Sequence, residues 1–227
     1  APINADGTVG TWASTSSFTY PRAYSQITTY NGRLYILGGT AFVTAAVVVL
    51  ADIQYASFNS DGTLSSWTIN SPSNNFPTPR AGHAAQAYNG YMYVMGGCTT
   101  TSCADTITNV DYGVINSDGS VSGWASTTSL DVGLVLPGSA IHGGRIYIVG
   151  GDSTSPGGMQ NKVRYASINT NGTIGSWTVN AVAMPDRLRD PAVAVYNGYL
   201  YIAGGCNAPA CPTITNTVRY AALNNNG

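Results

Sequence analysis

The most specific spacing of reactive residues in this chain belongs to its four cysteines, which form the Cys-x4-Cys pairs Cys98–Cys103 and Cys206–Cys211. Thiols at this spacing can close a short disulfide loop, which would indicate an oxidising compartment. They can also supply ligands to zinc. Because the pairs lie about 108 residues apart and neither has an adjacent histidine, we favour two disulfides and expect no metal and no cofactor.

A second group of candidate residues consists of arginines in or near segments expected to form inner strands: Arg22, Arg80, Arg187 and Arg189. Their guanidinium groups could recognise an anionic or sugar ligand near a channel mouth. Alternatively, they bond backbone carbonyls between neighbouring sheets, which is the interpretation that we prefer.

Catalysis finds little support in the residue types. The two histidines, His83 and His142, lie on different expected strands. No nucleophile–base pair, carboxylate pair or set of metal ligands is visible. We therefore predict that the chain is not an enzyme.

The composition narrows the class of protein further. The chain has 227 residues, a net charge of -1 and only 8% charged residues. So little charge gives no electrostatic footprint for nucleic acid or an anionic membrane surface. The abundant Ser, Thr, Asn, Gly and Tyr residues favour strands and turns over helices. No apolar stretch is long enough for a membrane span.

One unit is repeated four times and must position these residues. An apolar strand runs into a Gly-Gly pair at each copy, and its tyrosines, Tyr35, Tyr93, Tyr147 and Tyr201, are 58, 54 and 54 residues apart. Each copy also has one tryptophan: Trp12, Trp67, Trp124 and Trp177. Two independent markers with the same period identify a repeat architecture.

The second unit shows the anatomy of one repeat. We expect strands at 81–88, 91–95, 109–115 and 121–126, with tight turns at Asn89-Gly90 and at 116–119. Such a four-stranded antiparallel sheet has two apolar faces and is not stable alone. Stacking the sheets radially buries both faces, so we predict an all-β fold, a β-propeller of four blades.

The unit resembles the kelch repeat family in its extracellular, bacterial-type form. The resemblance rests on the hydrophobic-Tyr-x-x-Gly-Gly strand, the later Tyr and Trp, and Arg22 and Arg80 before the first-strand tyrosines. Leu134 and Leu188 stand at the Arg position in units three and four, which departs from the family pattern. The resemblance implies the fold closely and the function only loosely.

We expect one domain over residues 1–227, with blades at about 15–70, 71–127, 128–180, and 181–227 plus 1–14. The first seven residues align with residues 166–172, so the start of the chain overlaps its end within the repeat. Either the segment around Trp12 completes the last blade and closes a ring, or the four units belong to a larger propeller. The overlap favours the second alternative.

The segments that follow each Gly-Gly differ in every unit and are the expected binding loops. The segment of unit one, residues 40–50, is almost wholly apolar and includes Phe42, Val47, Val48 and Val49. It could be an extended third strand buried against a neighbouring blade, or an exposed apolar patch for a protein partner.

From these features we predict an extracellular or cell-surface module without catalytic activity, which binds a protein partner or assembles with itself through its variable loops. The alternative is a carbohydrate-binding propeller that uses Tyr, Asn and Arg side chains.

Overall fold

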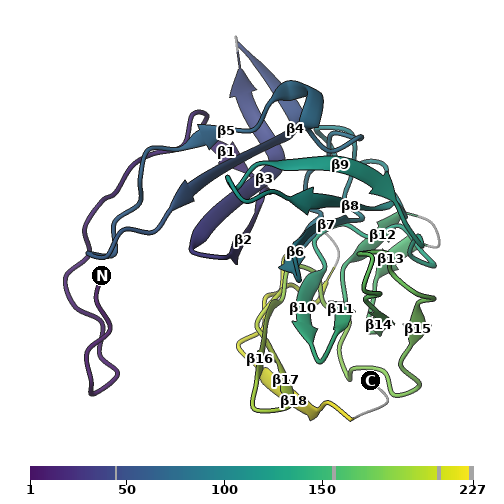
Figure 1. Cartoon of the computed structure of the whole chain (residues 1–227). Coiled ribbons are helices and arrows are strands. Elements are labelled where there is room, and N and C mark those ends of the chain that lie inside the picture. The colour runs from purple at the N-terminus through teal and green to yellow at the C-terminus, as the bar shows by residue number, and fades with distance from the viewer. Residues whose placement is uncertain (44, 155–156, 209–210, 225–227) are drawn as a thin grey trace.

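The computed structural model describes residues 1–43, 45–154, 157–208 and 211–224. Parts of three expected binding loops (Thr44, 155–156 and 209–210) and the last residues of the fourth unit (225–227) lie outside this description. Four antiparallel sheets follow one another round an arc (Figure 1). The predicted all-β propeller of four blades is confirmed.

Each blade is one repeat. The strands of blades 1 and 2 are β1 (Arg22–Ala23), β2 (Gln26–Tyr30), β3 (Arg33–Val43), β4 (Ala46–Ser57) and β5 (Thr68–Ile69), then β6 (Ala84–Tyr88), β7 (Tyr91–Met95), β8 (Val110–Ile115) and β9 (Val121–Ser126). A 3-10 turn, η1 (Pro72–Asn74), connects these two blades.

Blade 3 contains β10 (Gly138–His142), β11 (Arg145–Val149), β14 (Val163–Ser167) and β15 (Thr178–Val179), with a small hairpin of β12 (Asp152–Thr154) and β13 (Gly157–Met159) beside it. Blade 4 contains β16 (Ala192–Tyr196), β17 (Tyr199–Ala203) and β18 (Val218–Ala222). In the described part of the chain, no helix has the length and hydrophobicity needed to cross a membrane.

Turn chemistry sets the register of each blade. Asn89 and Gly90 adopt positive φ angles of 47° and 84°, as a type I′ hairpin requires. This turn joins β6 to β7, and Tyr93 of β7 then lies opposite Tyr112 of β8. The equivalent tyrosine pairs Tyr35–Tyr55 and Tyr147–Tyr165 also face each other across strands.

The hydrophobic core lies between neighbouring blades. Tyr35 and Leu37 of blade 1 pack with Met92 and Val94 of blade 2. The other face of blade 2 packs against blade 3, and blade 3 packs against blade 4, in the same way. Stacking therefore buries both faces of an inner sheet, which one sheet alone could not do.

The Gly-Gly pairs set the distance between blades. The second glycine of the first three pairs donates its N–H to the next blade: Gly39 to Arg80 O at 3.0 Å, Gly97 to Leu134 O at 2.7 Å and Gly151 to Leu188 O at 2.8 Å. A Cβ on Gly38 would lie 2.7 Å from Arg80 O, and the φ of Gly38 is 50°. Only glycine permits this conformation and this close approach.

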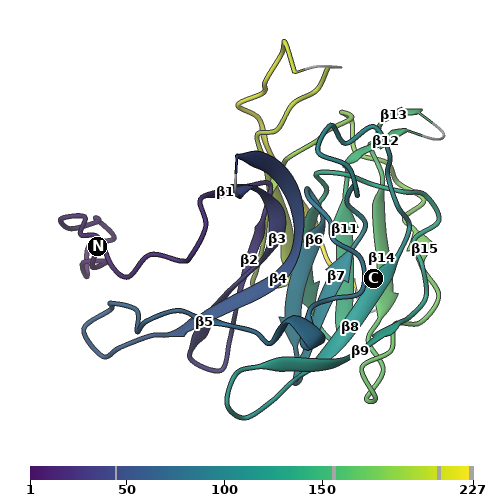
Figure 2. The same ribbon diagram turned by 90° about the horizontal axis from the view of Figure 1, so that it is seen from above.

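Blade 4 departs from the pattern of the other blades. It has three strands, and the N-terminal segment does not pair with β18 within the described residues. Instead, residues 1–14 extend away from blade 4 (Figures 1 and 2). Trp12, expected to complete this blade, is 81% exposed. In this structure the N-terminal strand does not close the ring.

Candidate binding surface

The variable segments gather on one side of the propeller, which we call the loop face. Figure 2 shows it at the top of the view, where the hairpin of β12 and β13 and the segment after β17 project. The tight turns lie at the opposite end. Binding residues of repeat proteins usually lie on such loops above a rigid scaffold.

Over blade 1, the loop face carries a β-hairpin rather than a loop. Strands β3 and β4 continue to pair beyond Gly38-Gly39, through Phe42 opposite Val47 to the end of β3. Strand β1 joins the hairpin with Arg22 opposite Ala41. The β-branched valines favour this extended pairing because they pack well on a pleated surface.

The predicted apolar residues of this hairpin have different environments. Phe42 and Val47 are 66% and 54% exposed and lie side by side across the two strands. Val48 is half-buried, and Val49 packs beside Ala81 and Cys98 of blade 2. The first pair, which we call the hairpin tip, is available to a partner, whereas Val49 supports the hairpin from below.

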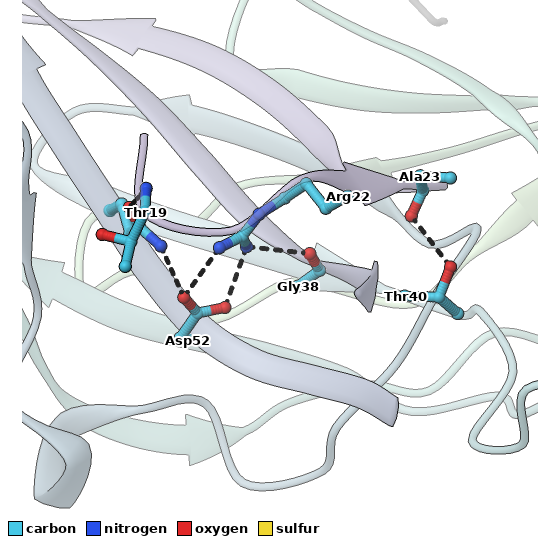
Figure 3. A network of polar contacts seen from close by, with 7 residues as sticks. Thr19, Arg22, Ala23, Gly38, Thr40 and Asp52 are labelled. Atoms are coloured by element: carbon cyan, nitrogen blue, oxygen red, sulfur yellow. Dashed lines mark hydrogen bonds and ion pairs between the residues drawn. The ribbon is translucent and has the colours of Figure 1, made fainter. Parts of the chain in front are cut away.

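Arg22 lies at the base of the hairpin and is fully buried. Its guanidinium donates two bonds of 2.9 Å to the Asp52 carboxylate and one to Gly38 O at 3.1 Å (Figure 3). Gln54 donates to the same carboxylate and accepts from the Thr19 N–H. This bidentate arrangement ties the segment before blade 1 to its third strand.

Arg80 has the same role in blade 2. Its side chain is fully buried, and it donates to Asp111 at 2.5 Å, to Asn109 O at 3.1 Å and to Gly96 O at 3.3 Å. Neither Arg22 nor Arg80 reaches the surface, so the placement favours the structural alternative over direct contact with a ligand.

His83 lies beside Arg80 between blades 1 and 2. Its ring is fully buried against Phe76, and neither ring nitrogen has a hydrogen-bond partner among the described residues. Burial, together with the positive charge of Arg80, lowers the pKa of His83 to about 3. The ring is therefore neutral at ordinary pH and acts as a packing residue.

In blades 3 and 4, the arginine and the aspartate of this ion pair exchange positions. Leu134 and Leu188 occupy the Arg positions, and the arginine moves to the third strand as Arg164 and Arg219. These bond Asp131 and Asp186 in the segments before each blade. None of the four aspartates that pair with these arginines in blades 1 to 4 was predicted from the sequence: Asp52, Asp111, Asp131 and Asp186. The Arg-Tyr dipeptides at 164–165 and 219–220, where blade 2 has Asp111-Tyr112, were the available signal.

A series of three backbone bonds links the four blades on the loop face, around the mouth at the centre of the arc. Tyr24, Gly82, Leu136 and Asp190 hold equivalent positions with φ of 56°, 59°, 53° and 55°. Gly82 N donates to Tyr24 O at 2.8 Å, Leu136 N to Gly82 O at 2.6 Å, and Asp190 N to Leu136 O at 2.8 Å. Three of these residues carry a side chain in a conformation that favours glycine, and the backbone bonds hold them there.

Two shallow clefts of about 230 and 610 Å³ open at this mouth and share Tyr24, Leu136 and Arg189 in their walls. Arg189 lies 3.5 Å from Asp152, and both side chains are about one quarter exposed. Of the four predicted arginines, Arg189 therefore lines a cleft. Arg187 is exposed and has no ion pair among the described residues.

Both cysteine pairs lie in the loop face at disulfide distance. The Cα atoms of Cys98 and Cys103 are 5.0 Å apart, and those of Cys206 and Cys211 are 5.3 Å apart. Within the described chain, no group of three side chains could hold a metal. Asp105 closes the first loop; burial opposes its ionisation, but hydrogen bonds from Thr99 and Thr100 outweigh it and lower its pKa to about 2.

A known family model matches two of the four repeats. Residues 79–107 and 187–220, on blades 2 and 4, match the family described as Kelch motif. Among solved structures, that of YjhT is similar, with a TM-score of 0.67 and 18% identity over 88% of this chain and 66% of that chain. At this identity the likeness shows the shared fold.

The two curated relatives that the chain matches are several times longer than the chain. The chain is 22% identical to alpha-scruin of Limulus polyphemus over 197 residues and 24% identical to beta-scruin of the same organism over 213 residues. These alignments cover 87% and 92% of this chain but only 20% and 22% of the scruins. The chain thus spans about a fifth of the length of the curated relatives that it matches.

Proposed function

We propose that this chain, a kelch-repeat β-propeller, is a module without catalytic activity that binds a protein partner through its loop face. Kelch propellers are commonly protein-binding modules. The single observation that carries the proposal is the hairpin tip, where Phe42 and Val47 expose apolar surface on two paired strands.

The physical argument rests on the cost of exposing these side chains. An exposed phenylalanine beside an exposed valine forfeits the apolar burial that a core position would supply. The hairpin is nevertheless held firmly, by Arg22 and Asp52 at its base and by Val49 packed on blade 2. A rigid apolar projection suits a protein partner, because little ordering entropy is lost when it binds.

The charge distribution supports a protein partner of low charge. Five of the nine cationic side chains form ion pairs within the fold. The surface therefore offers neither a basic patch for nucleic acid nor a strong field for charged ligands. Two cysteine pairs at disulfide distance support an extracellular or cell-surface location.

A photo-crosslinking residue in place of Phe42 tests the proposal. In an extract of the cells that carry the protein, we expect it to capture a partner that excess unmodified chain displaces. The doubly substituted chain F42S/V47S should fail to displace it, because the hairpin tip would no longer be apolar.

The matched control places the same residue at Phe58, which is 47% exposed beside a tight turn. We expect no displaceable product there. Equal products at both positions, or full displacement by F42S/V47S, would contradict the proposal.

The cleft beside Arg189 favours a second candidate function, carbohydrate binding. An exposed Tyr24 ring stands beside an Arg–Asp pair and the hydroxyl groups of Ser102 and Thr154, which could bond sugar hydroxyls. Glycan-array binding that is lost in R189A but retained in R187A would support this alternative. Binding that survives both substitutions would remove Arg189 from the site.

A further inference from the structure

The tryptophans show how an outer strand is attached to its blade. Trp67, Trp124 and Trp177 each donate their indole N–H to a backbone carbonyl at 2.9 Å, of Ser16, Asn74 and Thr128 respectively. Each acceptor lies six residues before the equivalent positions Arg22, Arg80 and Leu134. The same rule assigns Val182, six residues before Leu188, as the acceptor in blade 4.

Blade 4 has an open groove where this attachment would occur. The groove has a volume of about 610 Å³ and lies beside β18, with Met184, Leu200, Ile202 and Tyr220 in its wall. Val182 also lines it and is 75% exposed. Among the described residues, β18 has no outer partner strand, and an unpaired edge of this kind is a template for strand addition.

The N-terminal segment contains the turn that precedes the outer strand in blades 1 and 3. Its Asn4 N–H bonds Thr8 O at 2.8 Å, as Asn59 bonds Thr63 and Asn169 bonds Thr173 in the hairpins of blades 1 and 3. Yet its apolar side chains are unburied. Val9 is 55% exposed, whereas its counterparts Val121 and Ile174 are buried, and Trp12 is 81% exposed.

We infer that residues 8–14 of a second copy of this chain add to β18 as the fourth strand of blade 4, in a head-to-tail assembly. In the three complete blades, the residue after the tryptophan faces the third-strand tyrosine: Thr68 faces Tyr55, Ala125 faces Tyr112 and Thr178 faces Tyr165. The same register places Ala13 opposite Tyr220 and Trp12 in the groove beside Val182.

A second copy fits better than the chain's own N-terminus because the N-terminal segment is bonded to blade 1 and, within the described residues, not to blade 4. Thr15 and Ser16 are fixed to the outer strand of blade 1 by bonds to Leu64 and Ser65. Closing the arc would bend every interface between blades. Those interfaces are tightly packed, since a Cβ on Gly96 would lie 2.6 Å from Leu134 O and one on Gly150 would lie 2.4 Å from Leu188 O.

Blade 1 of the second copy would meet the exposed face of blade 4. A Cβ on the turn glycine Gly119 would touch Arg33 of the preceding blade, and one on Gly172 would touch Tyr91. Gly62 of blade 1 has nothing within 4 Å, and Tyr199 is the unmatched counterpart of Arg33 and Tyr91. The assembly brings these two together.

The contact is heterologous, which allows chains to add one after another. It lies away from the hairpin tip, so it stands independently of the proposed loop-face function.

Sedimentation of the 227-residue chain over a range of concentrations tests the inference. We expect reversible association that weakens at least about tenfold in W12A, because a buried indole is a typical interface anchor. A peptide of residues 8–16 should compete, and its W12A form should not. At concentrations where both are monomeric, thermal melting of W12A should match the parent, since Trp12 is 81% exposed in the single chain.

The control V114A removes an exposed apolar group from blade 2 and should associate as the parent does. F42S/V47S should also associate normally, which separates this contact from the loop-face function. A chain that stays monomeric, or association unaffected by W12A, would overturn the inference. So would a monomer whose Trp12 fluorescence is that of a buried indole, because the chain would then have closed on itself.

Discussion

The hairpin tip of blade 1 and the groove of blade 4 are both exposed apolar surfaces, but they have opposite origins. The hairpin tip lies on an extension of β3 and β4 beyond Gly38-Gly39, and the described strands β7–β8 and β17–β18 of blades 2 and 4 have no such extension. The groove is a regular part of the repeat, filled by Trp67, Trp124 and Trp177 in the other blades. The other blades show which residues would fill the groove of blade 4. The hairpin tip has no filled counterpart, so its exposed side chains indicate only that the partner is apolar.

The largest expected effect concerns the scaffold that both surfaces share. Removing one partner of a buried ion pair leaves an unpaired charge and costs about 3–5 kcal/mol. We therefore expect R80A to lower the free energy of unfolding by this amount in urea denaturation, since the buried Arg80 side chain bonds Asp111 and three backbone carbonyls.

The double substitution R80L/D111L is the control, because it leaves no unpaired charge at this position. It should recover a large part of the lost stability. If R80A alone were neutral, Arg80 would not be holding blade 2, and the structural interpretation of the buried arginines would be wrong.

The next effect separates the two surfaces. F42S/V47S should abolish partner capture and leave self-association intact, while W12A should do the reverse, each by at least about tenfold. Partner capture by crosslinking and sedimentation of the same variants measure this. Loss of both properties in either variant would show that the two surfaces are not independent.

A smaller effect concerns pH and the interface beneath the hairpin. The pKa of His83 in the folded chain is about 3, below the value of about 6.5 in an unfolded chain. As pH falls through this window, only the unfolded state binds the proton. Stability is therefore lost below about pH 6.5, at a rate that approaches 1.4 kcal/mol per pH unit.

Urea denaturation between pH 6.5 and 5 measures this slope, above the range in which aspartates titrate. H83Q should remove up to one proton from the number taken up on unfolding and so flatten the slope. H142Q, which removes the other and exposed histidine, is the matched control. A slope that H83Q does not change would place the proton uptake elsewhere.

The smallest effect is expected at Arg187, on the exposed side of the blade 4 segment. R187A should change the free energy of unfolding by less than about 0.5 kcal/mol, because no described residue pairs with it. A loss above 1 kcal/mol in urea denaturation would show a structural role that the neighbouring ion pairs do not suggest.

The sequence predicts the blades well because their signals are local. Turn dipeptides, alternating apolar residues and the Gly-Gly pairs place the four strands of blade 2 within a few residues of their observed bounds. The cysteine pairs are also local, and the structure places each at disulfide distance.

The rest depends on contacts between distant residues. Asp52 is 30 residues from Arg22, and Asp131 is 33 residues from Arg164, so no local pattern connects them. In the apolar segment of unit one, Phe42 and Val47 are exposed, whereas Val49 packs on blade 2. Successive side chains of a strand point to opposite faces, and the two faces of this hairpin contact different neighbours. The exposure of Trp12 depends on where blade 4 lies, which periodicity alone does not determine.

The most direct test of strand addition to blade 4 is a cross-link between two chains at the predicted register. One chain carries A13C, the other carries Y220C, and the two are mixed under mild oxidation. Residues opposite each other on paired strands are close enough for a disulfide. The account predicts a disulfide between A13C and Y220C, and none between A13C and Y196C on the exposed strand β16. It would be contradicted by the absence of this cross-link, or by its formation only within a single chain that carries both cysteines.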